Sequence, residues 1–173
     1  MRAALFAFSR GGCATARRIL AALPEEAWMC YTMPRFEEPG FLPLDKAVYG
    51  VSFSSMDALI FVGACGIAVR EIAPYVQSKK TDPAVLCIDE AGRFVVPLLS
   101  GHVGGANELA RRVAALTGGQ AAVSTATDVN GLFAVDVWAR ERGMAITDRA
   151  LAKEVSAALL EGRPVGSSPT RRA

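Results

Sequence analysis

Residues 57–76 read DALIFVGACGIAVREIAPYV and contain, in order, a strand, a turn and a helix. The run 57–62 is short and apolar, as expected of a buried strand, and two glycines follow at Gly63 and Gly66. Apolar residues then recur at helical spacing up to Val76. A strand that leads through a glycine turn into an amphipathic helix is typical of layered α/β domains.

The same order of strand, glycine turn and helix occurs earlier in the chain. The apolar run 3–8 precedes the pair Gly11-Gly12, and a helical pattern then continues to about residue 23. Further strands are expected at 27–32, 84–88, 93–99 and 121–124. Three further helices are expected: one that begins near 107, one that ends near 142, and one that begins at Thr147 or Asp148. This alternation predicts a three-layer, Rossmann-like α/β domain with a mostly parallel sheet.

One pair of strands is expected to run antiparallel. Only four residues, Asp89-Glu90-Ala91-Gly92, separate 84–88 from 93–99, and a link of this length suits a hairpin. The stretch 34–44 contains three prolines and one glycine and is expected to be a loop. The predicted sheet is therefore mostly parallel with an inserted hairpin.

The composition fits a globular protein and excludes several other classes. Hydrophobic residues make up 51% and charged residues 21% of the 173 residues, which is enough apolar material for a core and no signature of disorder. A net charge of +2 with dispersed basic residues is not typical of a nucleic-acid binder. No apolar stretch is long enough to cross a bilayer and the first residues do not resemble a secretory signal, so we expect a cytoplasmic protein without a membrane span.

The length of the chain suits one ordinary domain. We expect this α/β domain over 1–161 and a linker, or the truncated start of a next region, over 162–173, where large apolar residues are scarce. The four cysteines are scattered and contain no C-x-x-C pair. They are expected to be reduced thiols and not a zinc site or a disulfide framework.

Glycine-rich and polar residues mark three junctions between a strand and a helix. Ligands of open α/β sheets bind beyond the carboxyl ends of the strands, so we expect the junctions 63–70, 100–107 and 125–128 to converge at one rim and to bind an oxyanion or a carboxylate. The residues predicted to bind the ligand are Gly63, Gly66, Arg70, Lys80, Asp82, Gly101, Gly104, Gly105, Asn107, Thr125 and Thr127.

The residues predicted to carry chemistry are His102, Ser100 and Asp128. His102 is the single histidine and can take a proton from water near neutral pH. Ser100 is a candidate nucleophile, but its surroundings do not match G-x-S-x-G, and Ser100 and His102 stand too close in sequence for an ordinary triad. Activated water is favoured, with the amides of Gly104 and Gly105 as donors to an oxyanion.

Each of these features also has a plain structural interpretation. The glycines of 63–66 can merely supply unusual backbone angles, and a single histidine is often a surface or capping residue. Residues 125–128 can cap a helix, and the lysines 79–80 can be ordinary exposed charge. Dinucleotide and P-loop motifs do not occur in the sequence, so nucleotide cofactors have little support.

Taken together, the ordered segments resemble the CbiG family of cobalamin biosynthesis, over about 58–166. The segments that carry the resemblance are FVGACGIAVR (61–70), KKTDPAV (79–85), Asp89-Glu90, LLSGHVGGAN (98–107), TATDVNG (125–131) and LLEGRPVG (159–166). The resemblance implies hydrolysis of the ring-A lactone of cobalt-precorrin-5A, with release of acetaldehyde, to give cobalt-precorrin-5B in anaerobic cobalamin biosynthesis.

The resemblance also implies the partners and leaves an alternative open. The substrate would be a cobalt-corrinoid intermediate, and other cobalamin-pathway enzymes are candidate partners. Cobalt would be carried by the substrate, with no metal or cofactor held by the protein, although His102 as an axial cobalt ligand is an alternative. Members of the family usually continue into a C-terminal domain, so the second interpretation is a corrinoid-binding or partner-docking domain without activity of its own.

Overall fold

The apolar run near the start of the chain forms a central strand, β1 (Arg2–Ala7), in the computed structural model. Residues 3–7 are completely buried, because side chains on both faces of the strand meet other elements. β1 pairs in parallel with β2 (Ala27–Thr32) on one side and with β4 (Ala58–Val62) on the other. The predicted strand at the start of the chain is thus confirmed, and it lies in the middle of the sheet.

The structure describes residues 1–79 and 81–166. Their contacts divide the chain into two compact units, Met1–Val123 and a second unit from Ser124 onward. The expected linker over 162–173 stays a prediction, because most of that tail lies outside the described residues.

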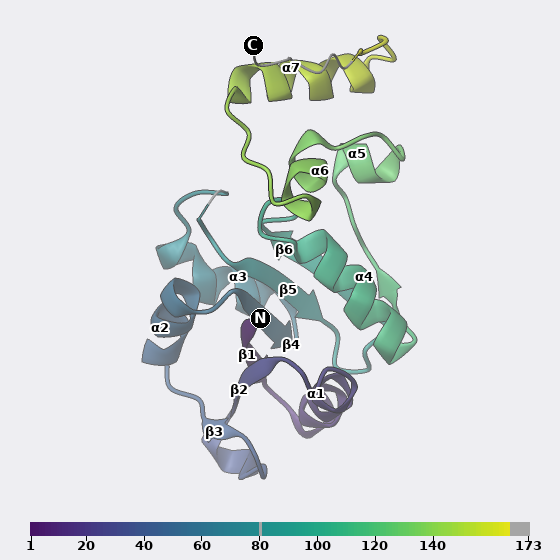
Figure 1. The fold of residues 1–173 in the computed structure, drawn as a ribbon. Coiled ribbons are helices and arrows are strands. Elements are labelled where there is room, and N and C mark those ends of the chain that lie inside the picture. Colours follow the sequence, from purple (N-terminus) through teal and green to yellow (C-terminus); the bar gives the residue numbers. More distant parts are fainter. Residues whose placement is uncertain (80, 167–173) are drawn as a thin grey trace. The chain divides into compact units, whose positions relative to one another are not determined.

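The described part of the first unit contains one seven-stranded sheet in the order β3-β2-β1-β4-β5-β6-β7 (Figure 1). The remaining strands are β3 (Leu42–Pro43), β5 (Ala84–Ile88), β6 (Phe94–Leu99) and β7 (Gln120–Ala121). The first five strands in the sequence run parallel, whereas β6 is antiparallel to β5 and β7 follows the direction of β6. The predicted α/β fold with a mostly parallel sheet and an inserted hairpin is confirmed.

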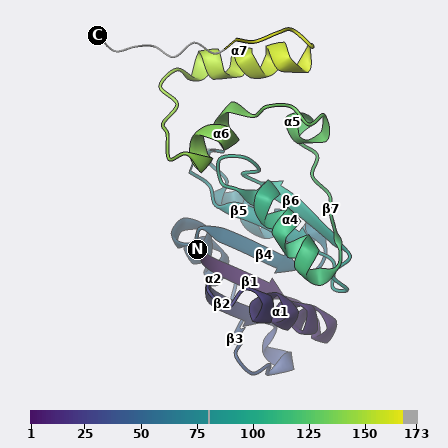
Figure 2. The same ribbon diagram turned by 45° about the vertical axis from the view of Figure 1, so that its right-hand side comes forward.

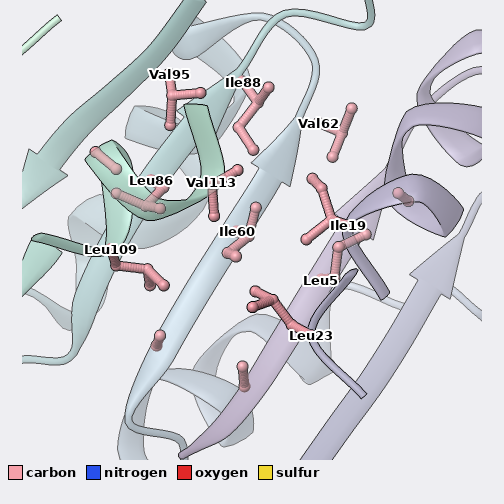
Figure 3. Packing of buried hydrophobic residues seen from close by; sticks show 14 of the residues in the cluster. Leu5, Ile19, Leu23, Ile60, Val62, Leu86, Ile88, Val95, Leu109 and Val113 are labelled. Atoms are coloured by element: carbon pink, nitrogen blue, oxygen red, sulfur yellow. The ribbon is translucent and has the colours of Figure 1, made fainter. Parts of the chain in front are cut away.

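Helices cover both faces of this sheet (Figures 1 and 2). The helices of the first unit are α1 (Arg10–Ala22), α2 (Ala47–Ser55), α3 (Cys65–Ile72) and α4 (Ala106–Thr117), with two short 3-10 turns, η1 (Pro34–Phe36) and η2 (Ala73–Tyr75). α1 and α4 bury one face, with Ile19 and Val113 against β-strand residues such as Ile60 (Figure 3). α2 and α3 bury the other face, where Phe6 and Phe61 lie.

The helix α2 was not expected from the sequence, which predicted no element between the loop 34–44 and the strand at 57. Its nine residues include three serines, Gly50 and two valines, all of low helix propensity. Packing stabilises it instead: Tyr49 and Phe53 are buried in the second core, and the Tyr49 ring lies 5.0 Å from that of Phe6. Tertiary contacts therefore outweigh local preference here.

The second unit is helical in its described part, with α5 (Ala126–Val129), α6 (Val135–Glu141) and α7 (Arg149–Leu160). The expected cap of the last helix is confirmed at Asp148, whose side chain accepts a hydrogen bond of 2.9 Å from the Leu151 amide. None of the helices in the described residues has the length and apolar character needed to cross a membrane.

Candidate active site

The loop between β6 and α4 closes on itself through backbone hydrogen bonds. The Ser100 carbonyl oxygen accepts from the Ala106 amide at 3.1 Å, and the Gly101 carbonyl oxygen accepts from the Asn107 amide at 3.0 Å. Ser100 has φ of 57°, one of only two positive values for non-glycine residues in the described chain. Strained backbone of this kind costs on the order of 1–3 kcal/mol and is found preferentially at functional sites.

Two glycines of this loop are required for close packing. A Cβ atom on Gly104 would lie 2.4 Å from the Ser100 Cβ and 2.9 Å from the Ser100 carbonyl oxygen. A Cβ atom on Gly101 would lie 2.8 Å from Oδ1 of Asn107, a side chain that is only 4% exposed. The glycines therefore let the loop fold tightly around Ser100 and hold its conformation.

The loop before β5 is joined to this loop through Asp82. The buried Asp82 carboxylate accepts the amides of Gln77 and Ser78, both at 3.0 Å, and the Asp82 carbonyl oxygen accepts the Ser100 hydroxyl at 2.9 Å. Asp82 thus holds two loops together. This structural role was not predicted, and the predicted contact of Asp82 with a ligand stays a prediction. The contribution of the Gln77 and Ser78 amides was not predicted from the sequence. The one feature that could have indicated it is Asp82, a few residues downstream, which can accept hydrogen bonds from preceding amides.

The structure places Lys79 and His102 on these joined loops. Lys79 is exposed on the loop that Asp82 closes, and Lys80 lies outside the described residues. His102 is half-buried and follows Ser100 by two residues. A half-buried imidazole between glycines is accessible to a small reactant.

The hydrogen bonds of the loop discriminate between the two chemistries considered from the sequence. A nucleophilic serine needs a base to receive its proton. The Ser100 hydroxyl, only 8% exposed, donates to the carbonyl oxygen of Asp82 and so is directed at the backbone. This geometry favours activated water over an acyl-serine.

The Gly105 amide, one of the two expected donors to an oxyanion, makes a hydrogen bond within the loop itself. The Gly105 amide donates to the His102 carbonyl oxygen at 3.1 Å, so it closes the turn within the loop. Gly105 is also the N-cap residue of α4 and has φ of 81°, which glycine adopts readily. The Gly105 amide thus makes a hydrogen bond within the loop, and the ligand-binding roles of Gly104 and Gly105 stay predictions.

The two glycine junctions of the first unit, 63–70 and 100–107, do not converge at one rim of the sheet, so this prediction is wrong. Gly63 follows Val62, which pairs with Ile88 at the carboxyl end of β5, whereas Ser100 follows Leu99, which pairs with Val85 near its start. The two junctions lie at opposite edges of the sheet, separated along the strands by about 10 Å or more at roughly 3.3 Å per residue. The reversal of β6 in the hairpin is the physical cause.

At the opposite edge, side chains of the protein fill the space around the expected glycine turn. A Cβ atom on Gly63 would lie 2.9 Å from the Phe8 ring, and the Gly63 amide donates to the Ile88 carbonyl oxygen at 2.8 Å. Gly63 therefore serves packing, and neither Gly63 nor Gly66 has a positive φ. The exposed Arg70 places Nη1 3.6 Å from the Cβ position of Gly66, over the first turn of α3.

The third junction belongs to the second unit. Thr125 is the N-cap residue of α5, but its side chain makes no capping hydrogen bond; Thr127 is buried, and its carbonyl oxygen accepts the Leu132 amide at 2.8 Å. Asp128 lines a groove of about 220 Å³ together with Phe133 and Trp138. The ligand-binding and catalytic roles of the three predicted residues stay predictions.

Metal ligands were not expected from the sequence. Within the part of the chain that the structure describes, no group of three or more histidine, cysteine, aspartate or glutamate side chains is arranged to hold a metal ion.

A Gly104→Ala substitution is expected to destabilise the first unit by about 1–3 kcal/mol, because the added methyl group overpacks the loop against Ser100. Urea unfolding can be followed by fluorescence of Trp28, in a Trp138→Phe background that removes the tryptophan of the second unit. Gly66→Ala is the matched control, since its methyl group meets only Arg70 at 3.6 Å. Equal stability of the two variants would contradict the packing argument.

The sheet with helices on both faces defines a doubly wound α/β protein, with a glycine-rich, histidine-bearing loop after β6. The crystal structure of a cobalamin biosynthesis protein G homologue from Sulfolobus solfataricus has a similar fold, with a TM-score of 0.57 over 92% of this chain and 46% of that chain, at 24% identity. At this level of identity the likeness concerns the fold.

Two family models match the chain, "Cobalamin synthesis G N-terminal" over 47–128 and "Cobalamin biosynthesis central region" over 133–169. The chain therefore belongs to the cobalamin biosynthesis G (CbiG) family, of which it carries the N-terminal and central regions, and the resemblance found in the sequence is confirmed.

Curated relatives of the chain share one name. The chain is 43% identical over 167 residues to the cobalt-precorrin-5A hydrolase of Salmonella typhimurium, covering 94% of this chain and 47% of that protein. It is 46% identical over 91 residues to the cobalt-precorrin-5A hydrolase of Priestia megaterium, covering 53% of this chain and 24% of that protein. The chain thus spans about half the length of the Salmonella relative.

Proposed function

We propose that this chain is the lactone-opening part of a cytoplasmic cobalt-precorrin-5A hydrolase of cobalamin biosynthesis. The observation that carries the proposal is the loop 100–107, in which a strained Ser100, obligatory glycines and a buried Asn107 hold His102 at one edge of the sheet. The names of relatives at 43% and 46% identity support the choice of substrate.

His102 acts on water in the proposed reaction. It accepts a proton as the water oxygen bonds to the carbonyl carbon of the ring-A lactone, and the acyl C–O bond then breaks. The Gly104 amide, beside the N-terminal end of α4, stabilises the negative charge on the carbonyl oxygen. After the ring has opened, the freed hydroxyl group loses its proton and the carbon–carbon bond between its carbon and the macrocycle breaks. Acetaldehyde leaves, while the electron pair of that bond and a proton pass to the macrocycle.

The substrate suits the charges near this edge. A cobalt-corrinoid precursor carries acetate and propionate groups, which the exposed Lys79 can bind. Binding by Lys80 stays a prediction, since Lys80 lies outside the described residues. The cobalt ion arrives as part of the substrate, so the protein needs no metal of its own in this proposal.

A second candidate function follows from the length of the matched relatives. Because the chain spans 47% of the Salmonella protein, it can correspond to a corrinoid-binding or partner-docking half whose chemistry requires the rest. Both candidates use the same loop, but only the first predicts turnover by the chain alone.

The test is to incubate the chain with cobalt-precorrin-5A, to record the corrinoid spectrum and to assay acetaldehyde. We expect acetaldehyde to form in proportion to the substrate consumed. A spectral change without acetaldehyde would favour the binding domain, and the absence of both signals would contradict both candidates.

A further inference from the structure

Two of the four cysteines meet at the sheet edge opposite His102. Cys87 lies in β5 beside Phe61 of β4, and its thiol donates to the Gly63 carbonyl oxygen at 3.2 Å. Cys65 follows Gly63 by two residues and begins α3. The strand register and the short turn after β4 therefore bring the Cys65 thiol against the Cys87 thiol, and the two groups interact.

The two thiols differ in accessibility. Cys65 is exposed, whereas Cys87 is 1% exposed. Burial and then the adjoining Cys65 thiol raise the pKa of the Cys87 thiol. Cys65 also stands at the N-terminal end of α3, with the Arg70 guanidinium folded back over the same turn. An exposed thiol is the one that a small-molecule disulfide can reach, so Cys65 is the accessible member of the pair.

The other two cysteines lack these features. Cys13 is completely buried, and its sulfur lies 3.2 Å from the Thr32 hydroxyl. Cys30 is buried in the same core, and burial raises the pKa of its thiol to about 11. The chain therefore contains an internal comparison: a solute can reach one thiol of the pair, that of Cys65, whereas Cys13 and Cys30 are both shielded within the core.

We propose that Cys65 and Cys87 form a reversible disulfide, with Cys65 as the residue that a small-molecule disulfide attacks first. The sulfur of Cys65 bonds to one sulfur of oxidised glutathione, the S–S bond breaks, and one glutathione leaves with the Cys65 proton. Cys87 then attacks the Cys65 sulfur and releases the second glutathione with its own proton. Two thiols are oxidised, and one oxidised glutathione is reduced to two.

The product would link the start of α3 to β5. Because this edge lies away from the loop 100–107, the proposal is independent of the lactone chemistry and stands or fails separately from it. The raised pKa of Cys87 predicts that the second step becomes faster as the pH rises, since only the thiolate attacks.

The experiment is to treat the chain with oxidised glutathione, to remove the excess, and to map tryptic peptides by mass spectrometry without reduction. Trypsin separates the four cysteines into the peptides 11–17, 19–35, 47–70 and 81–93. We expect a transient adduct of one glutathione on 47–70, followed by a link between 47–70 and 81–93 and a protein mass lower by two hydrogen atoms.

Matched variants separate the two steps. Cys87→Ser is expected to stop at the glutathione adduct on Cys65, whereas Cys65→Ser is expected to give neither adduct nor link. Far-ultraviolet circular dichroism before and after treatment checks that each variant remains folded. A wild-type chain that keeps the Cys65 adduct without linking, or that links 11–17 to 19–35 instead, would overturn the proposal.

Discussion

A His102→Ala variant is expected to form acetaldehyde from cobalt-precorrin-5A about 100-fold to 10,000-fold more slowly than the unsubstituted chain. A positioned general base contributes a factor of this size, and the chain has no second histidine to replace it. The Ser100 hydroxyl is directed at the Asp82 carbonyl oxygen, so it offers no alternative route through an acyl-serine. The measurement is the initial rate of acetaldehyde formation at saturating substrate.

Controls distinguish lost chemistry from lost binding or folding. Titration of the corrinoid spectrum should give a similar affinity for His102→Ala, because the imidazole acts on water and not on the carboxylate groups. Val103→Ala, which shortens the adjacent 47% exposed side chain, should keep nearly full activity. A His102→Ala rate within about threefold of the wild-type rate would refute the role of His102 as general base.

A Phe61→Ala substitution is expected to lower the free energy of unfolding of the first unit by about 3–5 kcal/mol. Phe61 is completely buried in β4, and its ring lies 4.8 Å from that of Phe6 and 5.9 Å from that of Tyr49. Removing the ring leaves a cavity between the sheet and α2, a helix whose own sequence favours it weakly. Urea unfolding followed by Trp28 fluorescence in the Trp138→Phe background measures the loss.

Phe94→Ala is the matched control for this substitution. Phe94 belongs to the same sheet, but it is 51% exposed, so its truncation should cost well under half as much. If both variants lost the same amount of stability, the buried aromatic cluster would not be the element that holds α2 to the sheet.

Much of the fold could be predicted because local signals and tertiary packing agree. The apolar runs of β1 and β4, followed by glycine turns and amphipathic helices, predicted the α/β order, and the four residues 89–92 predicted the hairpin. α2 could not be predicted, because its serines, valines and Gly50 disfavour a helix and only its contacts with the second core stabilise it.

The site was predicted less well because residue type does not determine which edge of a sheet a loop occupies. Ser100, Gly101 and Asn107 do lie together around His102, as the motif suggested. Gly63 and Arg70 lie at the other edge, since the predicted hairpin reverses β6 and carries its exit to the start of β5. The roles of Gln77 and Ser78 depend on backbone amides, which any sequence provides and no motif records.

The edge strands of the sheet are poorly suited to pair with a strand of another molecule. The strands at its two ends, β3 and β7, contain two residues each, and one of the two in β3 is Pro43. Where β6 extends past β7, Pro97 has no amide hydrogen to offer. Short end strands and prolines at the edges of a β-sheet disfavour edge-to-edge aggregation.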